Sequence, residues 1–165
     1  MSDSGIKQLS ADNWLMPDDV IRFFTGMERA EDYVAEVLGP RLSAKVPEDI
    51  CALFDVARGT MLYGYLYYPL FTVGLEQLFR VGEAAIQHKC AQLAISKTKK
   101  RFVDQINWLV ERDALSAEEA DGWHALRRLR NSASHPTKQS ITSPGMAIGI
   151  LYRLSEDINT LFDGS

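Results

Sequence analysis

The sequence predicts an all-α protein, a bundle of about five helices. Apolar residues recur at intervals of three and four along most of the chain, and start and stop signals for helices separate these segments. No stretch shows the alternation of apolar and polar residues that is typical of a strand. With 165 residues, 46% of them hydrophobic and 24% charged, the chain has the size and composition of one domain with a sizeable core.

The first third of the chain divides into a polar N-terminal lead-in, residues 1–17, and the start of a single helical domain, residues 18–165. Asp18 and Asp19 follow Pro17, and acidic residues are favoured at the N-terminus of a helix. The apolar periodicity then continues to residue 38, where Gly39 and Pro40 end it. One helix is therefore expected over residues 18–38.

The second helical segment runs from residue 50 to about residue 95, after a start signal of Pro47, Glu48 and Asp49. Pro69 lies in its middle. Because proline removes a backbone hydrogen bond and clashes with the preceding turn, it is expected to kink or split this long helix. The predicted bundle therefore includes a long helix that is kinked at Pro69.

Three further helices are expected in the second half of the chain. Residues 98–115 form an amphipathic pattern, and Ser116 with Glu119 is typical of a capping box at the start of the next helix. That helix leads to Arg130, and a final helix covers about residues 146–162.

Several classes of protein lack support in the sequence. No apolar run reaches the roughly 18 residues that a membrane span needs, and the N-terminus lacks the basic start and apolar centre of a signal peptide. A cytoplasmic protein without membrane contact is therefore expected. Cys51 and Cys90 are isolated, and His88 and His124 have no cysteine or carboxylate at metal-ligand spacing. The sequence predicts two small buried thiols, no metal and no cofactor.

Charge is divided unevenly along the chain, although its net value is only −4. Residues 1–57 hold five Lys and Arg against eleven Asp and Glu, whereas residues 97–138 hold nine against six. An acidic protein binds polyanions poorly as a whole, since affinity for phosphates comes from clustered cations. A local basic surface in the last third stays possible, and so does mutual neutralisation of the two parts within one fold or across a dimer.

The segment Arg130-Asn131-Ser132-Ala133-Ser134-His135, closed by Pro136, combines a permanent cation, an amide and an imidazole. Arginine is charged at every working pH, and histidine titrates near neutrality. One group that holds a phosphate and one that moves a proton are what RNA cleavage without a metal requires. The same six residues are also compatible with an ordinary helix end that has a polar cap.

Spacing alone does not bring Arg130 and His135 together, because residues five apart lie about 140° apart around a helix. Asn131 shares a face with His135 and with Arg127, each four residues away. Pro136 disfavours helical geometry at His135. Either the helix ends here and His135 turns towards Arg130, or a second copy of the chain supplies the missing partner.

The motif resembles the signature of the HEPN superfamily. In that signature an arginine is usually followed by a polar residue such as asparagine, and a histidine comes after four to six residues. The amphipathic residues 123–129 that lead into the motif are similar to the family pattern, as are residues 74–85, which resemble its long helix with acidic groups. The resemblance covers about residues 50–162. It implies an α-helical bundle that commonly forms a homodimer, with two motifs in one cleft.

Active members of this superfamily are metal-independent RNA endonucleases, often in toxin–antitoxin or other defence systems. Carried over to this chain, the resemblance implies that His135 assists attack by a ribose 2′-hydroxyl or protonates the leaving oxygen. Arg130 would neutralise the charge that develops on phosphorus, and Asn131 would position the backbone or a phosphate. Glu83, or alternatively Glu76, would orient a motif residue from the long helix.

The implied partners are RNA, a second copy of the chain, and an antitoxin or nucleotidyltransferase. Arg127 and Lys138 belong to the basic segment beside the motif and are expected to contact RNA. Two alternatives stay open. The cleft of a non-catalytic module would bind RNA, a nucleotide or a protein, whereas in a purely structural bundle Arg130 and Asn131 would pair with Glu83 or Glu76.

Overall fold

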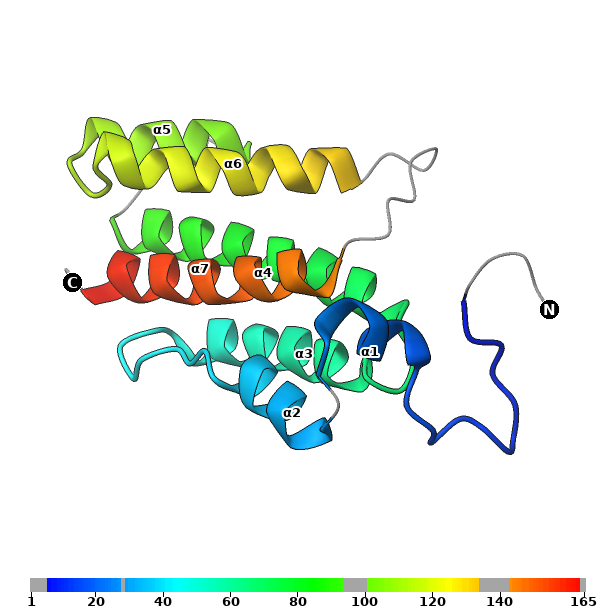
Figure 1. Ribbon diagram of the computed structural model, residues 1–165. Coiled ribbons are helices and arrows are strands. Elements are labelled where there is room, and N and C mark those ends of the chain that lie inside the picture. The colour runs from blue at the N-terminus through cyan, green and yellow to red at the C-terminus, as the bar shows by residue number, and fades with distance from the viewer. Residues whose placement is uncertain (1–5, 28, 94–100, 134–142, 164–165) are drawn as a thin grey trace.

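The computed structural model describes residues 6–27, 29–93, 101–133 and 143–163. Its described residues form seven α-helices and confirm the all-α prediction (Figure 1). In chain order they are α1 Asp19–Thr25, α2 Ala30–Leu38, α3 Glu48–Tyr63, α4 Leu70–Gln92, α5 Phe102–Glu111, α6 Ala117–Ala133 and α7 Pro144–Asp163. No helix in these ranges is long and apolar enough to cross a membrane.

Helix α4 is the centre of the bundle, because it packs against α3, α5, α6 and α7. In the view of Figure 1, α5 and α6 form the upper layer, α4 and α7 the middle layer, and α2 and α3 the lower layer. Helix α1 contacts α7 at one end of the bundle. This arrangement places α6, which carries the beginning of the Arg/His motif, directly on the central helix.

The prediction of one helix over residues 18–38 is wrong, because two helices, α1 and α2, occupy this range. Gly26 ends α1 in the left-handed conformation at φ 63°, and its N–H donates to the Arg22 carbonyl. The apolar periodicity continues across this break, whereas the glycine conformation that makes it is invisible in a hydrophobic pattern. The start was correct: Asp18 caps α1 through a hydrogen bond from the Val20 N–H.

Asp18 also joins α1 to the α3–α4 connection. It is only 1% exposed, its Oδ2 accepts from the Tyr68 N–H at 2.8 Å, and its own N–H donates to the Tyr65 carbonyl at 2.8 Å. A buried carboxylate is stable only when hydrogen bonds satisfy it. Three hydrogen bonds thus fix the start of the helical domain.

The long helix expected over residues 50–95 is split at Pro69, and the kinked form in the fold prediction is wrong. Helix α3 ends at Tyr63 and α4 begins at Leu70, directly after Pro69. At Gly64 the chain passes so close to the Phe71 ring that no β-carbon fits without movement. The connection lets α3 and α4 pack side by side as a helical hairpin, which one kinked helix cannot do. With this second break, the expected five helices become seven among the described residues.

The three C-terminal helices agree with expectation apart from their ends. Helix α5 begins at Phe102, while residues 98–100 of the expected helix lie outside the described residues. The capping box is confirmed, since the Ser116 N–H donates to Glu119 Oε2 at 2.7 Å and the Glu119 N–H donates to Ser116 Oγ at 3.1 Å. Of the two free cysteines, Cys90 is buried and Cys51 is half-buried.

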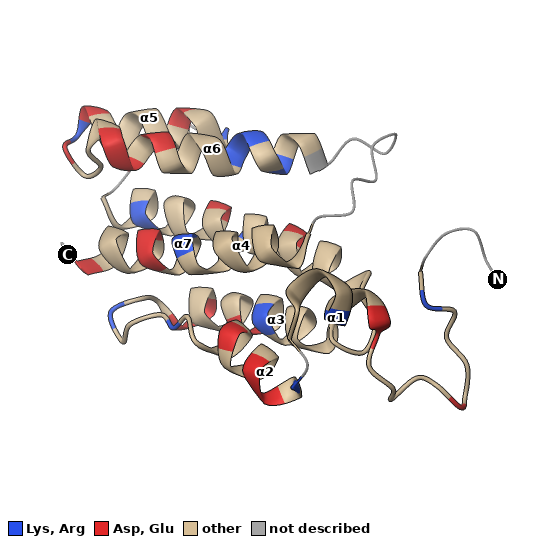
Figure 2. Ribbon diagram, viewed as in Figure 1, with Lys and Arg blue, Asp and Glu red and all other residues tan. Residues whose placement is uncertain are grey.

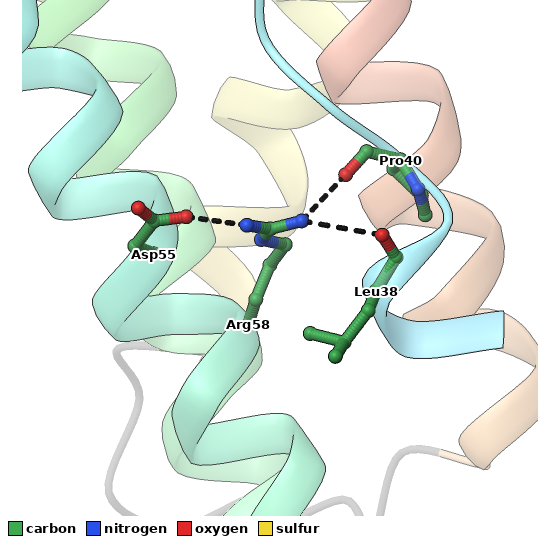
Figure 3. Close-up of polar contacts among 4 residues, drawn as sticks. All are labelled: Leu38, Pro40, Asp55 and Arg58. Carbon is green, nitrogen blue, oxygen red and sulfur yellow. Dashed lines mark hydrogen bonds and ion pairs between the residues drawn. The ribbon is translucent and has the colours of Figure 1, made fainter. Parts of the chain in front are cut away.

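Arg58 on α3 holds the end of α2 (Figure 3). Its Nη1 donates to the carbonyls of Pro40 at 2.9 Å and Leu38 at 3.4 Å, and its Nη2 donates to Asp55 at 2.5 Å. The last carbonyls of a helix have no partner within the helix, and a cation at this end also interacts favourably with the helix dipole. Arg58 therefore does for α2 what capping residues do elsewhere.

Candidate functional site

Arg130 and Asn131 lie in the last turn of α6, where the side chain of Asn131 is exposed and that of Arg130 is 42% exposed. Continuous amphipathic periodicity from the Ser116 cap brings the helix to this point. Of the motif predicted from the sequence, His135 lies outside the described residues, as does the proposed RNA contact Lys138. The structure therefore describes the cationic half of the motif.

Glu83 on α4 contacts Arg130: its Oε2 lies 3.1 Å from Arg130 Nη2. The glutamate side chain is 33% exposed, so both members of the ion pair reach solvent. Glu76 lies on the same face of α4, seven residues earlier, and is exposed. Of the two glutamates considered from the sequence, Glu83 is the one with a contact to the described part of the motif. At this separation the carboxylate attracts the guanidinium group and favours orientations of Arg130 that face Glu83.

The C-terminal half of α6 carries three arginines within four residues, Arg127, Arg128 and Arg130 (Figure 2). Arg128 is exposed, whereas Arg127 is half-buried and its buried Nε has no hydrogen-bond partner among the described residues. The acidic helix α2 lies in the layer farthest from α6 in this view, with α4 and α7 between them. The acidic helix α2 is therefore not the neighbour of these arginines; Arg130 pairs with Glu83 of α4, and Arg128 is exposed.

His124 is a candidate that the sequence reasoning set aside. Its Nε2 lies 3.1 Å from Asn107 Oδ1 on α5, and its buried Nδ1 has no hydrogen-bond partner among the described residues. Burial, reinforced by the nearby Arg127 and Arg128, lowers the pKa of His124, and Asp121 opposes this only weakly. The imidazole is therefore neutral at neutral pH, beside two permanent cations.

The helical spacing of His124 to Arg127 and Arg128, three and four residues, was a signal in the sequence for this cluster. The contact with Asn107 could not be found in this way, because Asn107 lies on another helix, α5.

No group of three or more His, Cys, Asp or Glu in the described part of the chain is arranged to hold a metal ion. Comparison with protein-family models, with curated proteins and with solved structures found no match to this chain. The site is thus defined by its own geometry: an arginine paired with Glu83 and an exposed asparagine in the last turn of α6.

Proposed function

We propose that this chain is a metal-independent endoribonuclease of the HEPN kind, in which Arg130 binds the scissile phosphate. The observation that carries the proposal is the position of Arg130: it reaches solvent at the end of α6 and is oriented by Glu83 at 3.1 Å. Oriented cations stabilise developing negative charge better than mobile ones, since no reorganisation is needed during the reaction. The exposed Asn131 adds a neutral donor beside it.

In the proposed reaction, a ribose 2′-oxygen attacks the adjacent phosphorus, and the bond from phosphorus to the 5′-oxygen breaks. His135 accepts the proton of the attacking hydroxyl or donates one to the leaving oxygen. Arg130 neutralises the charge on the phosphorus oxygens, and Asn131 positions the phosphate. The products are a 2′,3′-cyclic phosphate and a 5′-hydroxyl, so neither water nor a metal is needed for the cleavage step.

The proposal includes a homodimer in which a second copy of the motif supplies the other proton-transfer role. Arg127 and Lys138 then contact RNA beside the cleavage site. We also propose that the protein is cytoplasmic and that an antitoxin or a nucleotidyltransferase inhibits it.

The decisive experiment incubates the purified chain with end-labelled RNA in EDTA and compares it with His135→Ala. His88→Ala is the matched control, because His88 is a half-exposed histidine on α4 outside the motif. We expect the unmodified chain and His88→Ala to cut RNA and leave 2′,3′-cyclic ends, and His135→Ala to be inactive. RNA that is fully 2′-O-methylated should resist cleavage. Intact RNA with every variant would refute the enzymatic proposal.

A non-catalytic binding module is the second candidate, and the Glu83–Arg130 ion pair is also the observation that favours it. A carboxylate at 3.1 Å compensates much of the charge that a phosphate would need, and the chain as a whole carries −4. Expression in a host separates the two candidates. A nuclease should arrest growth unless His135→Ala is introduced, whereas a binding module should leave growth unchanged with either sequence.

A further inference from the structure

Two adjoining hollows lie between α6 and α7, away from the Arg130–Glu83 pair. The first has a volume of about 450 Å³ and the second about 530 Å³, and both are open to solvent. They share the residues Trp123, Arg153 and Asp157, so they form one continuous surface, which we call the α6–α7 groove. The two helices run antiparallel along it (Figure 1).

One half of the α6–α7 groove is apolar. Its walls include Leu129 from α6 and Met146 and Ile150 from α7, and Met146 is 50% exposed. Solvent-exposed apolar side chains that line a concave surface are typical of a binding site for another molecule. This half therefore offers apolar area that the described part of the chain leaves uncovered.

The other half of the α6–α7 groove is acidic. Glu118, Glu119, Glu156 and Asp157 line it, against the single cation Arg153. Arg153 Nε lies 3.0 Å from Asp157 Oδ1, which leaves the exposed Glu118 and Glu156 facing solvent. Burial raises the pKa of Asp157, and the nearby Glu156 and Glu119 raise it further against the opposing effect of Arg153. A cation that entered here would relieve this repulsion.

Glycines keep the α6–α7 groove open and set its depth. A β-carbon on Gly149 of α7 would meet no atom within 4 Å, so its absence leaves room for an occupant. Leu126 and Leu154 line the groove, and a β-carbon on Gly82 of α4 would overlap Leu126 and contact Leu154. Helix α4 is therefore closely packed against Leu126, one of the groove's lining residues, whereas the described residues leave open space around Gly149.

The dimensions of the α6–α7 groove favour an elongated occupant. Along α7 its lining extends from Met146 to Thr160, a rise of roughly 20 Å at about 1.5 Å per residue. A small molecule is usually bound in a pocket that encloses most of its surface, whereas helices of partner proteins lie in open apolar grooves of this length.

We propose that the α6–α7 groove docks a basic amphipathic helix of a partner protein. The apolar face of that helix covers Leu129, Met146 and Ile150, and its lysine-rich or arginine-rich end lies over Glu118 and Glu156. The inference is independent of RNA cleavage, because none of these residues belongs to the Arg/His motif.

The test uses two labelled helical peptides that carry leucines in one half and lysines in the other, in opposite orders. Binding to the full chain is followed by fluorescence anisotropy. We expect at least one peptide to bind with a micromolar Kd, and replacement of its lysines by glutamates to weaken binding about tenfold or more.

Two pairs of variants locate the binding. Gly149→Leu fills the α6–α7 groove, and its control Gly59→Leu makes the same change on α3, where a β-carbon also meets nothing within 4 Å. Glu118→Lys/Glu156→Lys reverses the acidic half, and Glu31→Lys/Asp32→Lys on α2 makes the same change in net charge elsewhere. The groove variants should weaken binding about tenfold or more, and the controls by less than about threefold.

Three outcomes would overturn the proposal. The first is that neither peptide binds. The second is that the peptide binds Gly149→Leu as tightly as it binds the unmodified chain. The third comes from sedimentation: if the chain is a dimer that Gly149→Leu converts to a monomer, a second copy occupies the groove, and the partner helix does not.

Discussion

Glu83 of α4 and Arg130 of α6 form an ion pair of 3.1 Å that joins the central helix to the motif helix. The Glu83 side chain is 33% exposed and the Arg130 side chain is 42% exposed. An ion pair with this exposure contributes only about 0.2–1 kcal/mol to stability. The pair still biases the long and flexible Arg130 side chain towards orientations that face Glu83.

This relationship predicts a separation of stability from activity in Glu83→Gln. The variant keeps the shape and loses the charge, so urea denaturation should show a loss of at most about 1 kcal/mol. RNA cleavage should fall, by up to about fivefold, because Arg130 loses the ion pair that orients it. Glu31→Gln, exposed on α2, is the control and should alter neither. A large loss of stability with unchanged RNA cleavage and binding would indicate a purely structural pair.

Gly74 and Gly59 predict opposite effects of the same substitution to alanine. A β-carbon at Gly74 of α4 would overlap the side chain of Met61 and lie 3.1 Å from the Met61 nitrogen and 3.2 Å from the Ala57 carbonyl oxygen. Since backbone cannot move aside cheaply, Gly74→Ala should lower the free energy of unfolding by about 1–3 kcal/mol. Gly59→Ala, with open space around it, should raise this free energy by about 0.5–1 kcal/mol. Equal effects in a denaturant titration would contradict the close packing of α3 and α4.

Arg58 is expected to be a determinant of stability rather than of activity. Its side chain is only 18% exposed and donates to the carbonyls of Leu38 and Pro40. Arg58→Ala leaves the Leu38 carbonyl at the end of α2 and the Pro40 carbonyl just beyond it without these donors, and should cost about 1–3 kcal/mol in thermal or urea unfolding. Asp55→Asn removes only the charge of the exposed partner, so its cost should stay below about 1 kcal/mol. A cost of Asp55→Asn equal to that of Arg58→Ala would show that the ion pair, and not the capping of α2, is the main contribution.

His124 predicts a dependence of stability on pH. Because its pKa is lowered in the folded chain, the unfolded chain takes up a proton first as the pH falls. The contribution of His124 to stability is therefore fully present above the ordinary histidine pKa of about 6.5 and declines below it. Urea denaturation between about pH 7.5 and pH 5 should show a steeper loss for the unmodified chain than for His124→Gln. Parallel curves would mean that the imidazole titrates as it does in water.

Local signals in the sequence predicted most helix positions correctly. The capping box of Ser116 and Glu119 is an example, since both of its hydrogen bonds lie within one turn of helix. The two errors arose where a break depends on backbone conformation or on packing. Gly26 adopts positive φ, and the split at Pro69 depends on Phe71 packing against Gly64 so that α3 and α4 lie together.

The candidate site shows the same division. Periodicity and capping act between residues a few positions apart, so the sequence alone predicts that Arg130 and Asn131 end an amphipathic helix with a basic C-terminal half. The tertiary structure was needed to show that Glu83 contacts Arg130 and that Asn107 contacts His124. It was also needed to show the α6–α7 groove, with its apolar half and its acidic half. Each of these depends on how two helices approach one another, and that is set by the packing of side chains from the whole bundle.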